Sequence, residues 1–198
     1  MASVLLEHEI RKAVVGMYDK VSNEAAVSAL YLALQQDESH IRKRAVEALG
    51  QIGGEAALPA LLQALSDPSS GVRERAVSAL EGIGGEHVIP ALHSALMDED
   101  FNVRKQVVES LGQIGGEATI PALHQALNDE SSSVRKRAVE LLGQIGGEAA
   151  LAALRHALND ESFSVSKRAV EAIEKLIAVE PESTEGEARM DVAAPNPV

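Results

Sequence analysis

Apolar residues recur along the chain at helical spacing, in two patterns that alternate. The first, seen over Ala57–Asp67, places three leucines at i, i+3 and i+7, which is one face of a helix that we call helix A. These leucines are Leu58, Leu61 and Leu65. The second pattern, seen over 72–85, predicts an amphipathic helix B. Its apolar stripe consists of Val72, Ala76, Leu80 and Ile83.

The two patterns repeat together with a period of 31 residues. Glycine pairs follow helix B at this step, at Gly53-Gly54, Gly84-Gly85, Gly115-Gly116 and Gly146-Gly147. The same step relates Asp67, Asp98, Asp129 and Asp160. Agreement of several columns at one period indicates a repeat array. Because one helix pair cannot bury both of its faces, neighbouring units must stack into an all-α solenoid.

The repeat divides the chain into three parts. Five full units run over residues 24–177. Residues 1–23 form a degenerate half unit, which we expect to cap the N-terminal end. Residues 178–198 are acidic, carry Pro and Gly and lack the repeat pattern, so they are predicted to be a disordered tail.

Turn chemistry supports the predicted helix boundaries. Pro59, Pro90 and Pro121 are expected in the first turn of helix A, where a missing N–H costs nothing. The glycine pair is expected to form a left-handed cap after helix B. Acids and hydroxyls such as those over 128–133 are expected to cap the start of helix B. Two alanine columns on helix A would let neighbouring helices approach closely.

Composition narrows the classes of function. Aromatic residues make up 2% of the chain, so the core must consist of Ala, Leu, Val and Ile. The absence of Cys excludes disulfides, thiolate nucleophiles and Cys-ligated metals. The net charge of −12 argues against nucleic-acid binding by bulk electrostatics. We find no apolar run long enough to predict a signal peptide or a membrane span. We therefore expect a cytoplasmic protein without a membrane partner.

Stretches such as VRKRAVELLGQIGGEAA, over Val134–Ala150, resemble the HEAT-like repeats of the phycobilisome-lyase type. The resemblance extends over roughly residues 10–177. It implies a right-handed α-solenoid with helix B on the concave side. It also implies a structural ladder in which an Arg in each helix B binds an Asp in a turn. The ladder residues are Arg42, Asp67, Arg73, Asp98, Arg104, Asp129, Arg135 and Asp160.

Basic residues gather where a helix disfavours them. Of the 18 Lys and Arg residues, 14 lie in the first turn of a helix B, beside the positive end of the helix dipole. The ladder accounts for one Arg column. The Lys column is predicted to pair with Glu at i+4, at about 0.2–0.5 kcal/mol per pair. These pairs are Lys43–Glu47, Lys105–Glu109, Lys136–Glu140 and Lys167–Glu171.

The remaining columns of helix B predict a polar surface that binds a protein. One column, facing outward from the concave side, holds Arg in four of five units and Gln in one. Phe101 and Phe163, at the start of their helices, are either partner anchors or hydrophobic staples. The candidate partner-binding residues are His40, Lys43, Arg44, Glu47, Arg75, Phe101, Lys105, Gln106, Glu109, Lys136, Arg137, Glu140, Phe163, Lys167 and Arg168.

Catalytic and metal sites find no support in the sequence. The HEAT-like enzyme family deoxyhypusine hydroxylase holds two irons with repeated His-Glu pairs, directly after the position that Val72-Arg73 occupies at the start of helix B here. Here those positions carry pairs such as Lys43-Arg44, and His8-Glu9 occurs once in another column. His93 and His124 share a helix A column that is expected to be exposed. We therefore predict no catalytic residue, no metal and no cofactor.

Two functions remain after these exclusions. The first is a non-catalytic scaffold that binds an unidentified protein through helix B. The alternative, suggested by the repeat type, is a bilin lyase subunit or a chaperone whose partner is a phycobiliprotein. Arg44, Arg75, Arg137 and Arg168 would then hold the tetrapyrrole propionates, in a trough that lacks aromatic residues.

Overall fold

The computed structural model describes residues 23–179. The predicted N-terminal cap (residues 1–23) and acidic tail (178–198) therefore lie almost wholly outside the described residues. A first helix occupies 23–33. It is followed by α2 (Ser39–Ile52), α3 (Gly54–Ala64), α4 (Ser70–Ile83), η1 (Glu86–Val88), α5 (Ile89–Ala95), α6 (Phe101–Ile114), η2 (Glu117–Thr119), α7 (Ile120–Ala126), α8 (Ser132–Ile145), α9 (Gly147–Ala157) and α10 (Phe163–Val179).

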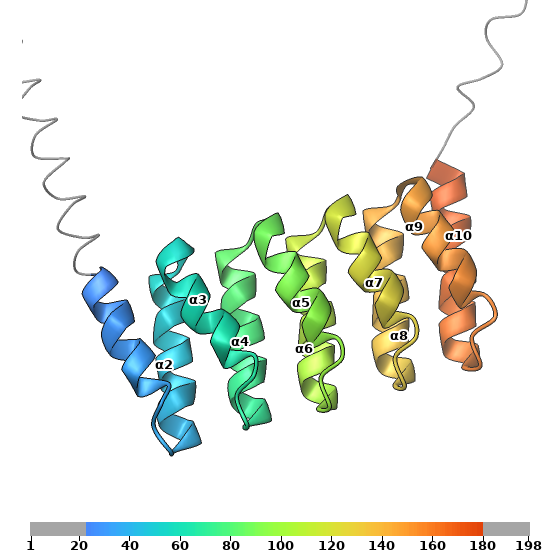
Figure 1. Cartoon of the computed structure of the whole chain (residues 1–198). Helices are drawn as coiled ribbons and strands as arrows, with labels where there is room; N and C mark the ends of the chain where they lie inside the picture. Colours follow the sequence, from blue (N-terminus) through green and yellow to red (C-terminus); the bar gives the residue numbers. More distant parts are fainter. Residues whose placement is uncertain (1–22, 180–198) are drawn as a thin grey trace, which may run out of the picture.

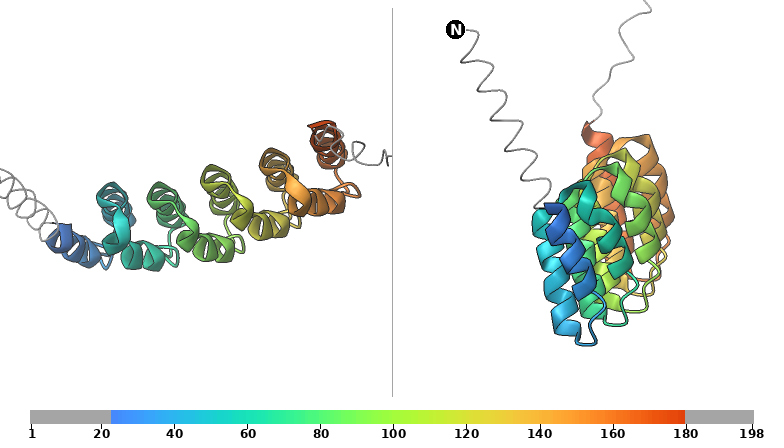
Figure 2. Two further views of the ribbon diagram at one scale, coloured as in Figure 1. Left: turned by 90° about the horizontal axis from the view of Figure 1, so that it is seen from above. Right: turned by 60° about the vertical axis from the view of Figure 1, so that its left-hand side comes forward.

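The helices form two parallel layers, as the repeat predicts (Figure 1). The helix over 23–33 and α3, α5, α7 and α9 are the A helices, and α2, α4, α6, α8 and α10 are the B helices. Figure 2 shows that the stack curves gently, with the B layer on the inner side. The B helices also pack more closely on one another than the A helices do. The protein is an all-α solenoid with a concave B surface.

One continuous core runs between the two layers. Its largest fully buried side chains repeat at the 31-residue step in both layers. They are Leu49, Leu80, Leu111 and Leu142 from helix B, and Leu61, Leu92, Leu123 and Leu154 from helix A. The alanines of helix A lie between them, with Ala60, Ala122 and Ala153 at most 4% exposed. Small and large side chains thus alternate, which lets an aromatic-poor core reach close packing.

Glycines inside the B helices set how closely these helices approach. A Cβ on Gly50 of α2 would lie 2.9 Å from the Cβ of Ala79 in α4. Between α6 and α8 the alanine position holds Leu141, and a Cβ on Gly112 would lie 2.5 Å from its Cδ2. A side chain at Gly50 would therefore meet the Cβ and backbone of Ala79, whereas one at Gly112 would meet only the flexible end of Leu141.

The turns between units confirm part of the predicted chemistry and correct the rest. Gly115 ends α6 with φ 66° and ψ −168°, and Gly116 follows with φ 76° and ψ 166°. Positive φ with extended ψ is accessible to glycine and strained for other residues. The predicted left-handed helical cap is therefore wrong in ψ, because the chain extends at once into the next unit.

Proline and capping positions differ between units. Pro90 and Pro121 are the second residues of α5 and α7, as predicted, but Pro59 lies inside α3. The prediction fails there because two alanines after Glu55 let α3 begin directly at Gly54. In the other two units the residue before Pro is Ile, and the corresponding segment forms a 3₁₀ turn. Among α2, α4, α6 and α8, a side chain caps only α6, where Asp100 accepts from the Asn102 N–H at 2.8 Å.

Truncation of a central core leucine should destabilise the whole stack. Leu111 is fully buried in α6, in the middle of the array. Leu111→Ala should lower the free energy of unfolding by about 2–5 kcal/mol, because it leaves a cavity between the layers. Urea denaturation followed by circular dichroism measures this change. Leu62→Ala, at a position that is 39% exposed, is the control and should cost much less. Equal losses in the two variants would contradict this assignment of the core.

Candidate functional site

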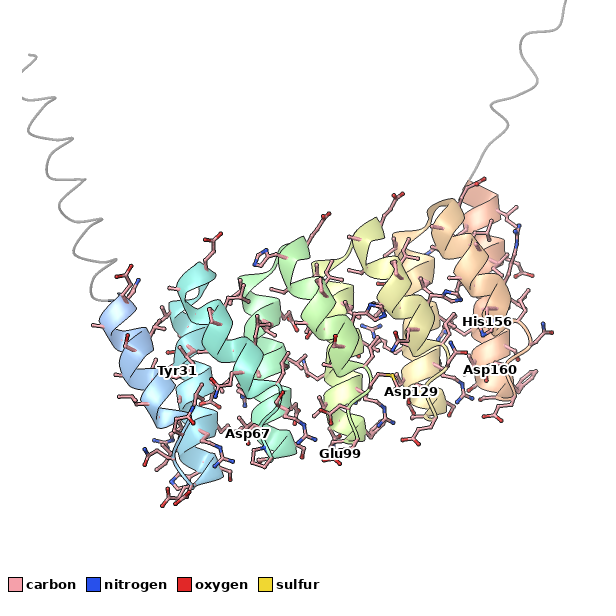
Figure 3. All side chains as sticks on the ribbon, viewed as in Figure 1. Tyr31, Asp67, Glu99, Asp129, His156 and Asp160 are labelled. Atoms are coloured by element: carbon pink, nitrogen blue, oxygen red, sulfur yellow. The ribbon has the colours of Figure 1, made fainter. Side chains whose placement is uncertain are left out.

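A buried ladder of ion pairs runs along the edge where each A helix joins its B helix. In each pair the Arg of one unit binds the Asp in the loop of the next unit through two nitrogens, a fork geometry that suits a carboxylate. The Nε–Oδ2 distances are 2.7 or 2.8 Å. The pairs are Arg42–Asp67, Arg73–Asp98, Arg104–Asp129 and Arg135–Asp160. Figure 3 shows Asp67, Asp129 and Asp160 along this edge.

Each guanidinium also closes the loop of its own unit. Nη1 of Arg104 donates to the backbone carbonyls of Asp98 and Glu99, at 2.9 and 3.3 Å. Asp129 in turn accepts from the backbone N–H of Ser131 at 2.8 Å. Within residues 23–179 no buried side-chain nitrogen or oxygen lacks a hydrogen-bond partner. Each Arg of the ladder, at the start of its B helix, thus has all of its side-chain hydrogen-bond partners in two loops, its own and that of the next unit. The ladder joins these two loops at every step.

The ladder also shifts the pKa values of its members. The carboxylate partners raise the pKa of Arg42, Arg73, Arg104 and Arg135 above the ordinary value, although burial opposes this. The hydrogen bond from Arg135 lowers the pKa of Asp160. Burial raises the pKa of Asp67, but the bonds from Arg42 and the Ser69 N–H outweigh it, so the net shift is downward.

A second, exposed ladder lies on the concave surface, and we call it the concave ladder. Arg75 of α4 binds Glu47 of α2 at 3.1 Å, and Arg137 of α8 binds Glu109 of α6 at 2.7 Å. Arg168 of α10 binds Glu140 of α8 at 3.2 Å. These side chains are between about a quarter and less than half exposed, so each pair contributes only up to about 1 kcal/mol.

This concave ladder corrects the predicted partners of the glutamates. Of the four predicted i,i+4 pairs only Lys167–Glu171 is formed, at 3.8 Å. The other glutamates are held by the Arg of the following unit instead. Sequence spacing misses this because the competing Arg lies on another helix, 28 residues away. Lys43, Lys105 and Lys136 therefore make no ion pair within residues 23–179.

The two phenylalanines lie at helix starts. Phe101 and Phe163 are the first residues of α6 and α10 and are 39% and 80% exposed. A staple requires the residue before the cap to pack on the helix, so this geometry does not fit that alternative. His40, the second residue of α2, is also exposed.

The histidines of the A helices contact side chains of a neighbouring A helix in the convex layer. The His93 ring contacts the Gln125 side chain, and the His124 and His156 rings meet edge to face at 5.7 Å. In the described part of the chain no group of three or more His, Asp or Glu side chains could hold a metal ion. None of the helices over 23–179 has the length and hydropathy needed to cross a bilayer.

The stacked helix pairs with their Arg–Asp turns define a helical-repeat solenoid. The HEAT repeat family model matches residues 5–81, 58–131 and 120–185. The chain belongs to the HEAT repeat family.

Solved structures similar to this chain include several solenoids. The complex of CpcE and CpcF of phycocyanin lyase from Nostoc sp. PCC7120 is 24% identical with a TM-score of 0.58, covering 77% of this chain and 65% of that chain. A designed armadillo repeat protein in complex with the peptide (KR)4 is 28% identical with a TM-score of 0.54, covering 77% and 82%. Cex1p is 15% identical with a TM-score of 0.64, covering 83% and 38%. No curated protein sequence matches the chain significantly.

The two ladders should differ sharply in what they contribute to stability. Arg104→Ala leaves Asp129 buried without its cation and should cost about 3–5 kcal/mol in the free energy of unfolding. Arg137→Ala removes two partly exposed pairs, with Glu109 and Glu140, and should cost about 0.5–2 kcal/mol. Urea denaturation of both variants measures the difference. Similar losses would show that the edge ladder is not the main electrostatic support of the stack.

The depressed pKa values of Asp67 and Asp160 predict acid sensitivity. Their contribution to stability is present above the unfolded-state pKa, about 3.9, and is lost as pH falls through the lower folded-state values. The unfolding free energy of the wild type should therefore decline from pH 5 to pH 2. Asp160→Asn should be less stable at pH 7 and decline less. Glu148→Gln, at an exposed residue in the first turn of α9, should retain the wild-type decline. An unchanged decline in Asp160→Asn would contradict the proposed linkage.

Proposed function

We propose that this solenoid is a non-catalytic interaction module that binds a protein partner through its concave B surface. The observation that carries the proposal is that the two faces of helix B have different roles. The buried ladder and the leucine core support the stack, and the columns that vary most in charge among units face the concave side. The convex column also varies, from Tyr31 to Arg155, but only the concave column reverses its charge, from Lys43 to Glu74 and back to Lys105. A change of charge along a concave solenoid surface suits recognition of an irregular partner.

The candidate surface combines Arg–Glu pairs with cations that form no ion pair in the described part of the chain. Arg44 is exposed, and neither it nor Lys105 forms an ion pair within residues 23–179. The Arg–Glu pairs of the concave ladder lie on the same surface. A surface of this composition suits polar contacts that set specificity and association rate. The designed armadillo protein in complex with (KR)4 is a precedent for a solenoid that holds a peptide.

A second candidate is a bilin lyase subunit or a phycobiliprotein chaperone, favoured by the similarity to the CpcE–CpcF complex. The chain spans 65% of that protein's length, and 24% identity carries the fold alone. A pocket of about 410 Å³ lies between α8 and α10, lined by Glu140, Arg168 and Glu171 among others, with no aromatic side chain. Three of the four arginines that would hold propionates, Arg75, Arg137 and Arg168, already bind glutamates. These features favour the interaction module.

Charge reversal on one face should locate the interface. Arg44→Glu alters the concave surface, and Arg155→Glu makes the same change on an exposed residue of α9 in the convex layer. We expect proteins captured from a lysate of the source cells to be lost with Arg44→Glu and retained with Arg155→Glu, as read by mass spectrometry. Circular dichroism confirms that both variants fold.

Other results of the same capture would redirect the proposal. Loss with Arg155→Glu alone would move the interface to the A layer, and no difference would exclude the Arg44 end of the concave face. A phycobiliprotein among the proteins lost with Arg44→Glu would favour the second candidate, which a bilin absorbance shift on mixing then tests.

A further inference from the structure

One contact between B helices departs from the other three. Four repeat columns line each contact, three on the first helix and one on the second. At the joints α2–α4, α6–α8 and α8–α10 the first helix has Lys, Glu and Gly in its three columns, and the second helix has Arg in its column. At the α4–α6 contact, which we call the central joint, all four columns change. The residues there are Glu74, Ser78, Glu81 and Gln106.

The substitutions at the central joint are coupled. Where the other joints pair Glu with Arg, this joint has Ser78 and Gln106, so both charges of the ion pair are missing together. Where the other joints place Gly against Ala or Leu, this joint has Glu81 against Ser110, and the Ser110 hydroxyl donates to Glu81 Oε2 at 2.7 Å. Gln106 Nε2 donates to the Ser110 hydroxyl at 3.4 Å.

These changes reverse the local charge. Over the four columns each of the other joints carries two cations and one anion, which is one net positive charge. The central joint carries two anions and no cation, which is two net negative charges. Glu74 and Glu81 lie at i and i+7 on one stripe of α4. Neither forms an ion pair with any residue in 23–179.

The carboxylate of Glu81 is also held in position. Ser110 is fully buried, so its hydroxyl is a fixed donor, and it leaves the second oxygen of Glu81 available. The carboxylate lies half buried between two helices, where a partner cation would be attracted more strongly than at a fully exposed site. Lys43 of α2 and Lys105 of α6 share the column of Glu74, so the two helices beside α4 carry the opposite charge there.

We infer that Glu74 and Glu81, on the α4 side of the central joint, bind a Lys or Arg side chain of an extended partner segment. Acidic side chains on both sides of that residue are bound by Lys43 of α2 and Lys105 of α6. This inference rests on the proposed function and specifies its partner. Adjacent helices lie about 8–10 Å apart and an extended chain rises about 3.3 Å per residue. The partner therefore has the pattern acid-x-x-basic-x-x-acid.

A peptide-display selection on the immobilised full chain tests this pattern. The random library should be enriched in sequences with a central Lys or Arg and acids three residues to each side. The tightest enriched peptide, labelled for fluorescence polarisation, is then measured against two matched variants. Glu74→Gln with Glu81→Gln should raise its Kd about 3- to 10-fold, because the partner cation loses both of the carboxylates that attract it.

The control removes the same charge elsewhere. The double substitution Glu86→Gln with Glu117→Gln changes two exposed turn residues and should leave the Kd unchanged. Gln106→Arg places at the central joint the residue that other units carry, so it is compatible with the fold. Because this Arg adds a competing cation beside Glu81, it should weaken binding as well.

The remaining outcomes separate this inference from the proposed function. Peptides that lose affinity with Arg44→Glu or Lys105→Glu, but not with the Glu74 and Glu81 pair, would overturn the inference and keep the concave interface. Peptides whose Kd is unchanged in every concave variant would contradict both this inference and the proposed function. A selection that yields no enriched peptide would do the same. A selected pattern of basic residues alone, as in (KR)4, would also overturn the predicted acidic flanks.

Discussion

The bidentate pair between a buried arginine and the aspartate of the next loop is the interaction on which this solenoid depends. Cations in the first turn of a helix oppose the helix dipole, and burial makes their isolation costly. The Arg–Asp fork resolves both problems, and its remaining donor binds the carbonyls of its own loop. Every unit is thereby tied to the next at a fixed distance and orientation, so the helices stack in register.

Because the edge carries the electrostatic support, the concave surface is free to vary. Its Arg–Glu pairs are partly exposed and contribute little to stability. Replacement of one such pair by Ser78 and Gln106 therefore leaves the stack intact while it changes the local charge. A repeat protein can alter its recognition surface in this way without a change in its core. Fold and function separate along the two faces of one helix, which is why the family alone does not name a partner.

Particular residues show how far sequence reasoning extends. Period, helix patterns and leucine columns predicted the layers, and the Arg–Asp pairs followed from the family resemblance. The partners of Glu47, Glu109 and Glu140 were predicted wrongly, because local spacing suggests Lys at i+4 and the actual partner is on the next helix. The central joint was missed as well. The signal that could have revealed it is Glu81, which stands in the column where other units have Gly50 and Gly112.

The sequence by itself determined the period, the two-layer solenoid, the composition of the core and the glycine turns, because these follow from local periodicity and backbone sterics repeated many times. Tertiary structure decided the rest. The curvature that puts helix B inside, the choice of Arg over Lys as partner for each glutamate, and the contact of Glu81 with Ser110 all depend on distances between helices. Those distances are set by how Gly, Ala and Leu141 pack between neighbouring units, which no single repeat specifies.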